Sequence, residues 1–325
     1  MELIPLGANQ PPDRFYLGGE LIARFRGTAA RSDHVPEDWV ASTTTLAGHE
    51  SLGLTTLPDG RTLKAAVEAD AEAWLGPRHV AAFGSDTMLL VKLLHAGQRL
   101  PVHAHPDRAF ARTRLGHAHG KVEAWHILVG GDVYLGLRED ANPAALVALV
   151  DAQAVDELLG LLHRRRVAPG DTVYVPAGML HAIGPGILLA ELQEPEDLSI
   201  LLEWEGFELD GRTHGHLGLG FDTALTAVDH RALAPGDLDA LVSGGGEQAL
   251  PPAADDYFRL ERVQGAATLD PGFAVLIVTH GVVEIAAGGS ALRLAAGGTA
   301  VVPWSAGPLT VTGDGELLVA RPPSA

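Results

Sequence analysis

The sequence of 325 residues contains no cysteine. Disulfide bonds and thiolate metal ligands are therefore excluded, and any metal ion must be held by histidine, aspartate, glutamate or glutamine. A cytoplasmic location is the expectation for such a chain, and its N-terminal stretch lacks the basic and apolar segments of a signal peptide. No run of about eighteen apolar residues is present, so we expect no membrane-spanning helix.

Positive charge is also scarce. Aspartate and glutamate number 41 against 23 lysines and arginines, which gives a formal net charge of −18. So acidic a chain repels phosphate backbones, and nucleic acid is not an expected partner. It also repels an anionic small molecule, unless cations gather at one place. The lysines are Lys64, Lys92 and Lys121.

Short apolar runs alternate with turn residues along the chain. The 39 glycines and 21 prolines separate runs rich in valine, leucine and isoleucine, which predicts a mainly β protein. The predicted strands are Met88–Leu94, Ala124–Gly130, Asp132–Leu137, Asp171–Pro176 and Gly186–Gln193. Two stretches rich in alanine, leucine and glutamate predict helices, Leu63–Gly76 and Pro143–Arg166.

The end of the chain resembles its middle. GDTVYVPAGMLHAI at 170–183 is echoed by GGTAVVPWSAGPLTV at 297–311, and HILVGGDVYLGL at 126–137 by VLIVTHGVVEIAA at 275–287. We therefore predict a metal-binding β-barrel with helical insertions over residues 1–215, a connecting segment over 216–254 and a second barrel over 255–325. The second copy has no histidine where the first has His181, so we expect it to hold no metal.

Histidines and a glutamate recur at spacings typical of a metal site. The pattern G-x₅-H-x-H ends in His103 and His105, which point to the same side if they lie on a strand. Glu123 opens an E-x₆-G pattern, and His181 closes G-x₅-P-x-G-x₂-H. We predict that these four residues bind one divalent ion; the alternative is that they are surface histidines of a histidine-rich chain.

A second His-Ala-His follows the first. His117 and His119 lie between glycines in a polar stretch, which predicts a solvated loop, with substrate gating as the alternative role. His126 follows Glu123 by three positions, so on a strand it faces away from that glutamate, and we interpret it as structural.

These patterns resemble the cupin superfamily and, within it, the class I mannose-6-phosphate isomerases. The likeness extends along nearly the whole chain and implies two cupin (jelly-roll) β-barrels. The blocks that carry it are Glu37-Asp-Trp39-Val-Ala-Ser42, Leu90-Val-Lys92-Leu-Leu94, Lys121-Val-Glu123, Pro176-Ala-Gly178-Met-Leu-His181 and Glu191-Leu-Gln193.

The resemblance implies a metal-dependent aldose–ketose isomerase that interconverts mannose 6-phosphate and fructose 6-phosphate, or acts on a closely related sugar. It implies Zn²⁺ on His103, His105, Glu123 and His181. The family usually has glutamine at the first of these positions, and a third imidazole brings the set closer to Fe²⁺ or Mn²⁺ sites. Glu191 and Lys121 are the implied catalytic residues, and Lys92 and Glu37 the implied substrate-binding residues.

One family position is changed. The family's catalytic arginine falls on Leu201, and an alkyl group cannot stabilise negative charge. Either another arginine replaces it, with Arg112, Arg114 and Arg138 as candidates, or the activity has changed. A sugar-binding or regulatory cupin without catalysis is therefore an alternative function. An Fe²⁺ cupin oxygenase is another, favoured by the three histidines.

Overall fold

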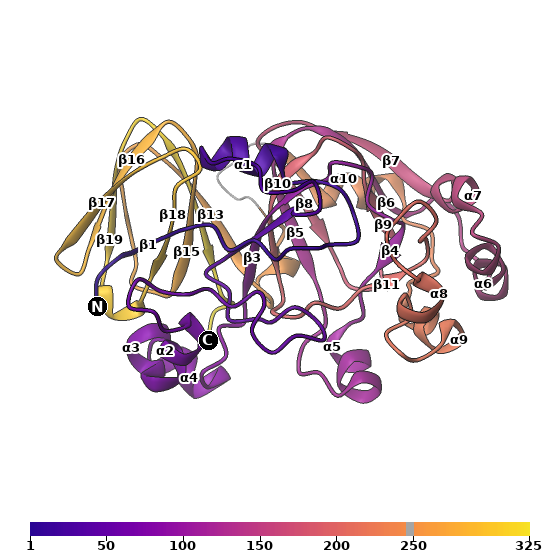
Figure 1. Ribbon diagram of the computed structural model, residues 1–325, viewed down its shortest axis with the longest axis horizontal. Helices are drawn as coiled ribbons and strands as arrows, with labels where there is room; N and C mark the ends of the chain where they lie inside the picture. The colour runs from indigo at the N-terminus through magenta and orange to yellow at the C-terminus, as the bar shows by residue number, and fades with distance from the viewer. Residues whose placement is uncertain (245–249) are drawn as a thin grey trace.

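The computed structural model describes residues 1–244 and 250–325, and Figure 1 shows two β-rich halves side by side. Within that part of the chain no helix is long and apolar enough to cross a membrane. The strands form antiparallel sheets, two in each half, and none of the described sheets closes into a hydrogen-bonded barrel. The predicted mainly β fold is confirmed.

The first half contains a six-stranded and a five-stranded sheet. The six-stranded sheet has the order β12 (Val242–Gly244), β8 (Asp171–Val175), β5 (Glu123–Val129), β10 (Leu188–Gln193), β3 (Leu90–His95) and β2 (Glu37–Val40). The five-stranded sheet has the order β11 (Ile200–Leu201), β4 (His103–Ala104), β9 (His181–Ile183), β6 (Gly131–Leu137) and β7 (Leu162–Val167). Apolar side chains of the two sheets, among them Trp125, Ile127, Val133 and Ile183, share one core.

The second half repeats this arrangement. Its five-stranded sheet has the order β1 (Ile4–Leu6), β18 (Thr299–Val302), β15 (Ala274–His280), β20 (Glu316–Arg321) and β13 (Arg259–Gln264). Its four-stranded sheet has the order β14 (Ala267–Leu269), β19 (Leu309–Gly313), β16 (Val282–Ala287) and β17 (Ser290–Ala295). The orders β8-β5-β10-β3 and β4-β9-β6-β7 thus recur as β18-β15-β20-β13 and β14-β19-β16-β17, as expected from the sequence echo.

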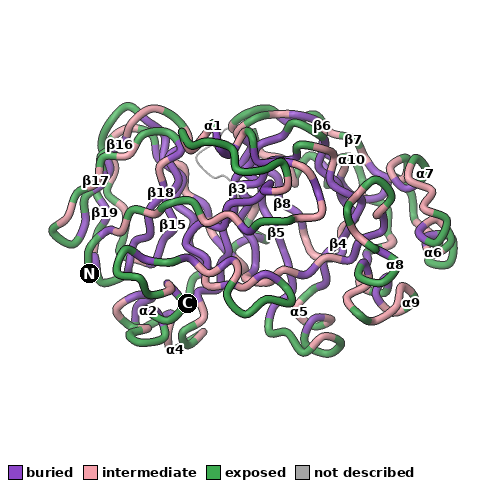
Figure 2. Tube along the Cα trace, in the orientation of Figure 1, coloured by how far each residue is buried: buried purple, intermediate pink, exposed green. Residues whose placement is uncertain are grey.

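The two halves share a large apolar core. Val91 and Leu93 of β3 and Ala190 and Leu192 of β10 belong to the same buried cluster as residues of the five-stranded sheet of the second half, such as Ile277. Figure 2 shows buried chain running through the junction of the halves. The opposite face of β3 and β10 is therefore free to face the inside of the first half.

Short helices decorate the sheets. They are α1 (Glu20–Arg26), α2 (Leu63–Ala69), α3 (Ala71–Leu75), α4 (Pro77–Phe83), α5 (Arg108–Phe110) with the π-helical turn Ala111–Leu115, α6 (Pro143–Ala152), α7 (Val155–Gly160), α8 (Gly211–His214), α9 (Phe221–Ala224) and α10 (Pro235–Leu241). The predicted connecting segment over 216–254 contains α9, α10 and β12, and its residues 245–249 lie outside the described part of the chain.

Both helix predictions need correction. The predicted helix Leu63–Gly76 is two helices, because Asp70 ends α2 and its side chain caps α3 by accepting from the amide of Ala73. The predicted helix Pro143–Arg166 is also two helices, α6 and α7, and it is wrong beyond Gly160, since β7 begins at Leu162. The three arginines of β7 lie on an edge strand, and Arg164 pairs with Asp132 of the neighbouring β6.

Candidate metal centre and active-site pocket

Three histidines converge between the two sheets of the first half. His103 lies on β4 and His181 on β9, directly opposite each other in the strand pairing, and His105 follows β4. Their ligand nitrogens lie within 4.8 Å of one another, and all three side chains are buried. A metal ion needs several histidine, aspartate or glutamate ligand atoms close together, and these three histidines meet that condition within the described residues.

Backbone carbonyls orient the three rings. The Nδ1 atoms of His103, His105 and His181 lie 2.8, 2.7 and 2.9 Å from the carbonyl oxygens of Pro101, Leu198 and Met179. An Nδ1–H that donates to a carbonyl leaves the lone pair on Nε2, the arrangement typical of metal-binding histidines. Burial lowers the pKa of His181 to about 3, so its ring is neutral, and its buried Nε2 has no hydrogen-bond partner among the described residues.

Glu123, at the start of β5, closes the group. Its Oε1 lies 2.8 Å from His105 Nε2 and its Oε2 lies 3.7 Å from His181 Nε2. Although burial alone would raise it, the charges of Lys121 and His105 hold the pKa of Glu123 well below its usual range. The ammonium of Lys121 lies 2.6 Å from this Oε1 and 3.2 Å from His105 Nε2, so it bridges the two atoms. Three imidazoles that present Nε2 and one carboxylate are ligand types that Zn²⁺, Fe²⁺ and Mn²⁺ take, so these four residues, the metal group, fit a divalent ion.

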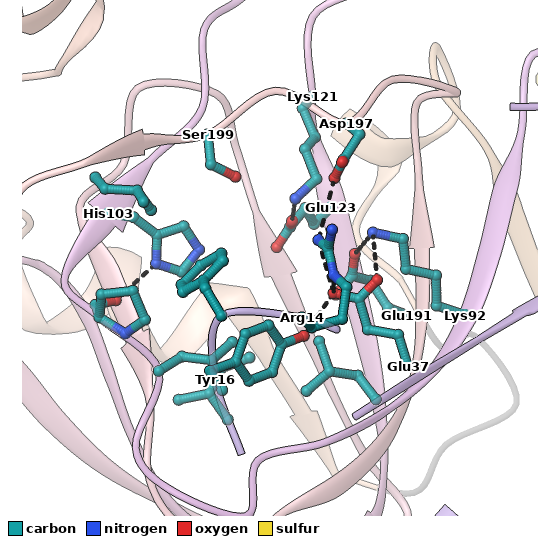
Figure 3. A pocket seen from close by; sticks show the side chains of 16 residues that line it. Arg14, Tyr16, Glu37, Lys92, His103, Lys121, Glu123, Glu191, Asp197 and Ser199 are labelled. Atoms are coloured by element: carbon teal, nitrogen blue, oxygen red, sulfur yellow. Dashed lines mark hydrogen bonds and ion pairs between the residues drawn. The ribbon is translucent and has the colours of Figure 1, made fainter. Parts of the chain in front are cut away.

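His103 and Glu123 line part of a small pocket, shown in Figure 3. Its lining consists of Arg14, Phe15, Tyr16, Glu37, Lys92, Leu94, Leu100, Pro101, His103, Lys121, Glu123, Ile183, Glu191, Asp197, Ser199 and Leu201. The cavity volume is about 50 Å³, well below the roughly 300–1,000 Å³ of ligand pockets. A sugar phosphate therefore needs these walls to separate when it enters.

The inward face of the six-stranded sheet carries the charged residues of the pocket. Glu191 on β10 lies between Lys92 on β3 and Trp125 on β5 in the strand pairing. Burial, and then the charge of Glu123, raise the pKa of Glu191 to about 7. Its Oε1 has no hydrogen-bond partner among the described residues and lies 3.9 Å from Lys92 Nζ. Glu191 is thus a buried carboxylate poised to exchange a proton near neutral pH.

Lys121 contacts the metal ligands directly. Its Nζ lies 2.6 Å from Glu123 Oε1 and 3.2 Å from His105 Nε2. Burial opposes the charge of this ammonium, but Glu123 and Glu191 raise its pKa above the ordinary value, so the cation is retained. The side chain can therefore stabilise negative charge that develops beside the metal group.

Glu37 on β2 is surrounded by donors. It accepts hydrogen bonds from Tyr16 Oη at 2.6 Å, from Trp39 Nε1 at 2.6 Å and from Arg14, and lies 3.7 Å from Lys92 Nζ. Despite its burial, the charges of Arg14 and Lys92 and these hydrogen bonds hold the pKa of Glu37 far below its usual range. Glu37 is therefore a fixed negative charge that holds Arg14, Tyr16 and Trp39 in place by accepting their hydrogen bonds.

The arginine of the pocket is Arg14, which the sequence did not single out. Leu201 lines the pocket, as expected from its position next to His103 in the strand pairing. The candidate substitutes Arg112, Arg114 and Arg138 are all exposed and none lines the pocket, so the interpretation that one of them replaces the arginine is wrong. Arg14 comes from an N-terminal loop far away in the chain, and no spacing pattern pointed to it.

The second His-Ala-His is not part of the metal group. His117 is exposed, as predicted, and its Nδ1 lies 3.0 Å from Glu196 Oε2. His119 is buried rather than solvated, because its Nε2 lies 2.7 Å from Asp86 Oδ2 and fixes the ring against the protein. His126 faces the second half, with its Nε2 3.9 Å from Glu316 Oε1.

The chain was compared with known proteins. No protein-family model matches it. It is 32% identical over 148 residues, 44% of this chain and 46% of the relative, to the Bacillus subtilis protein named "Mannose-6-phosphate isomerase ManA". It is 25% identical over 322 residues, 94% of this chain and 95% of the relative, to "Probable mannose-6-phosphate isomerase GmuF" of the same organism.

The solved structures agree with the sequence relatives. A mannose 6-phosphate isomerase bound with zinc and yttrium superposes with a TM-score of 0.75 at 15% identity, covering 100% of both chains. Together these comparisons confirm the predicted resemblance: the chain shares its sequence patterns and its fold with the mannose-6-phosphate isomerases.

Proposed function

We propose that this protein is a metal-dependent aldose–ketose isomerase that interconverts mannose 6-phosphate and fructose 6-phosphate, or a closely related sugar pair. The observation that carries the proposal is a buried carboxylate with a pKa of about 7, Glu191, in a pocket that is also lined by His103 and Glu123. The buried His105 and His181 lie close to His103 and complete a metal-competent set. The relatives named mannose-6-phosphate isomerases support the same reaction. Catalysis is assigned to residues 1–215, with 255–325 as a scaffold, in a cytoplasmic enzyme.

The metal site is assigned to His103, His105, Glu123 and His181. The ion that we favour is Zn²⁺, since a related fold was solved with zinc. When bound there it would act as a Lewis acid on the oxygens of the reacting carbons, making the carbon-bound proton more acidic. The chain's own contribution is to hold the three rings through backbone carbonyls.

The proton transfer is assigned to Glu191 as the general base. In its ionised form it takes the proton from the carbon next to the carbonyl of the sugar and returns it to the former carbonyl carbon. The hydroxyl proton of the first carbon passes to the former carbonyl oxygen, so no net proton is gained or lost. Lys92 lies 3.9 Å from this carboxylate, and its charge favours the ionised form against the effect of burial. Lys121 lies beside the metal ligands and stabilises negative charge that develops on the sugar oxygens.

The test is turnover of the zinc-loaded protein on mannose 6-phosphate, with fructose 6-phosphate, unphosphorylated mannose and fructose as parallel substrates. We expect isomerisation of the phosphorylated sugar that disappears with a chelator and returns with zinc. Chelator-insensitive turnover would contradict the metal role. Tight binding of a sugar without any turnover would instead assign the protein to the non-catalytic sugar-binding class, which Leu201 in the pocket favours.

A further inference from the structure

The lining of the pocket contains three cations among the described residues, Arg14, Lys92 and Lys121. Lys121 is engaged by Glu123 beside the metal ligands, and Lys92 lies between Glu37 and Glu191 with its Nζ 4.7 Å from the centre of the Trp39 ring. The contacts of Lys92 with its two carboxylates, at 3.7 and 3.9 Å, are beyond hydrogen-bond distance, but one of the two is the assigned base, Glu191. Among the described residues, the ion pairs of Arg14 are instead with Glu37 and Asp197. Arg14 is therefore the pocket cation that is paired neither with the assigned base nor with a metal ligand.

Few of the N–H groups of Arg14 are used. Among the described residues, the hydrogen bonds that its side chain donates come from Nε at 3.3 Å and from Nη2 at 3.2 Å, and both end on the same oxygen, Glu37 Oε1. A guanidinium carries five N–H donors in a planar fork that matches the oxygens of a phosphate. Most of that fork remains for a ligand.

Glu37 anchors the guanidinium, whereas Asp197 touches it loosely. Tyr16 and Trp39 hold Glu37 through short hydrogen bonds, so this carboxylate cannot follow a moving partner. Asp197 Oδ1 lies 3.8 Å from Arg14 Nη2, beyond hydrogen-bond distance. A phosphate can therefore replace Asp197 at Arg14 while the contact with Glu37 persists.

The backbone of Arg14 is fixed as well. Its amide donates to the carbonyl of His34 at 3.1 Å, and its own carbonyl lies 2.7 Å from His34 Nδ1. The neighbouring Phe15 and Tyr16 rings pack edge to face, with their centres 5.2 Å apart. The guanidinium is held in place before any ligand arrives, which favours tight binding.

Arg14 lies away from His103 in the pocket. In Figure 3, His103 lies at one side of the pocket and Glu37 and Lys92 at the other, with Arg14, Glu123 and Lys121 in the middle. A phosphorylated sugar can place its reacting carbons at the histidines and its phosphate at Arg14 in this arrangement. We propose that Arg14 is the phosphate-binding residue of this pocket, anchored by Glu37 and released by Asp197 when the substrate enters; the assignment rests on the proposed isomerase function for its substrate.

The test uses the zinc-loaded full chain and inorganic phosphate as the binding probe, measured by calorimetry, beside KM and kcat for mannose 6-phosphate. Loss of a charge-assisted, bidentate hydrogen-bond pair commonly weakens binding about 10- to 150-fold. We expect Arg14→Met to raise the Kd of phosphate and the KM by factors in this range, and Arg14→Lys to raise them less. Asp197→Asn removes the competing carboxylate and should lower the Kd several-fold.

Arg26→Met is the matched control, since Arg26 is a buried arginine that pairs with Asp38, next to Glu37, but does not line the pocket. It should leave the Kd of phosphate within twofold of wild type. A purely structural role of Arg14 predicts the same Kd in Arg14→Met and no gain in Asp197→Asn, and either result overturns the proposal. If Arg14→Met does not fold, the sign of the change in Asp197→Asn decides.

The two proposals fail separately. Suppose that the wild type binds phosphate but shows no isomerase turnover, and that Arg14→Met loses the phosphate binding. This outcome supports the anion site and contradicts the reaction. Wild-type turnover with an unchanged KM in Arg14→Met supports the reaction and contradicts the assignment of Arg14.

Discussion

Glu191 differs from the other carboxylates of the pocket in what surrounds it. Glu37 and Glu123 each have cations or hydrogen-bond donors within 3.2 Å, whereas the nearest ammonium to Glu191 lies at 3.9 Å. Burial therefore dominates at Glu191 and raises its pKa, while the neighbouring cations dominate at the other two and lower theirs. The surroundings thus give Glu37 and Glu123 a fixed negative charge and allow Glu191 to exchange a proton.

Glu191→Gln should therefore remove the base without removing the metal. We expect kcat for mannose 6-phosphate to fall by about 10²- to 10⁴-fold, the usual contribution of a positioned base. Zinc content, measured by elemental analysis, should stay at the wild-type level. Glu284→Gln, at an exposed position of β16 in the second half, is the control and should change neither value. Turnover within threefold of wild type in Glu191→Gln would assign the proton transfer to another group.

The twin His-Ala-His gives a second prediction at this scale. His105→Ala removes one donor of a single site, and we expect zinc affinity to fall more than about 100-fold, since even loss of a supporting contact costs 10- to 100-fold. The double variant His117→Ala, His119→Ala should keep its zinc, because these side chains bind Glu196 and Asp86 instead. Loss of zinc in the double variant would show that the wrong pair was chosen.

Side-chain spacing explains which site residues could be predicted from the sequence. His103 and His105 share a strand direction and His181 closes a Pro/Gly turn, so local pattern alone indicates their common face. Arg14 and Asp197 reach the pocket from loops, where no periodicity records the direction of a side chain. His119 was misjudged for a related reason, since its burial depends on Asp86, which is distant in sequence.

At the scale of elements, the loop that carries Arg14 depends on a close backbone approach. A Cβ atom at Gly18 would collide with the carbonyl oxygen of His95 and lie 2.7 Å from Pro36 Cβ. Gly97 donates its amide to the Leu17 carbonyl at 2.9 Å on the other side. Glycine at position 18 therefore lets the N-terminal loop lie against the end of β3.

Gly18→Ala should displace this loop and Arg14 with it. If Arg14 binds the phosphate, we expect the Kd of inorganic phosphate and the KM for mannose 6-phosphate to rise at least several-fold, with zinc content unchanged. Calorimetry measures the Kd, steady-state kinetics the KM, and elemental analysis the zinc content. Gly7→Ala is the matched control, since a Cβ there meets no atom within 4 Å. A Gly18→Ala protein that unfolds at the wild-type temperature and binds phosphate normally would contradict this account of the loop.

Strands were predicted better than helices, for a physical reason. The strands β5, β6, β8 and β10 are nearly continuous apolar runs bounded by glycine or proline, and their predicted ranges are correct to within two residues. Residues 161–166 read as a helix end because basic residues often close helices. In the structure these arginines lie on the edge strand β7. Arg164 pairs with Asp132 of β6 and Arg165 with Asp239 of α10, and both aspartates are distant in the sequence.

At the scale of the whole molecule, the repeated halves meet through β3, β5 and β10 of the first and β13, β15 and β20 of the second. His126 of β5 lies in this junction, 1% exposed, near Glu316 and Arg262. Thr279, Gln264 and Arg262 already engage Glu316. Burial, and then the charge of Arg262, lower the pKa of His126 to about 4, while Glu316 and Asp171 oppose the shift only weakly.

This histidine should make the junction sensitive to acid. Its pKa is lower in the folded chain than the roughly 6.5 of an unfolded histidine, so the unfolded state binds the proton first. The free energy of unfolding is then fully retained above about pH 6.5 and falls as the pH drops toward 4, by roughly 3 kcal/mol in total for a shift of this size. His126→Asn cannot take up this proton and should lose that part of the pH dependence.

The measurement is urea unfolding of the metal-free wild type and of His126→Asn at intervals between pH 7.5 and 4. The histidines of the metal group titrate in both proteins, so the difference between the two curves isolates His126. At pH 7.5 the variant should be the less stable protein, because it buries a polar amide at the junction in place of the neutral imidazole ring. The difference should shrink steadily as the pH falls below about 6.5. Parallel curves over the whole range would show that His126 takes up its proton equally in the folded and the unfolded chain, and that the acid sensitivity of the fold arises elsewhere than at the junction.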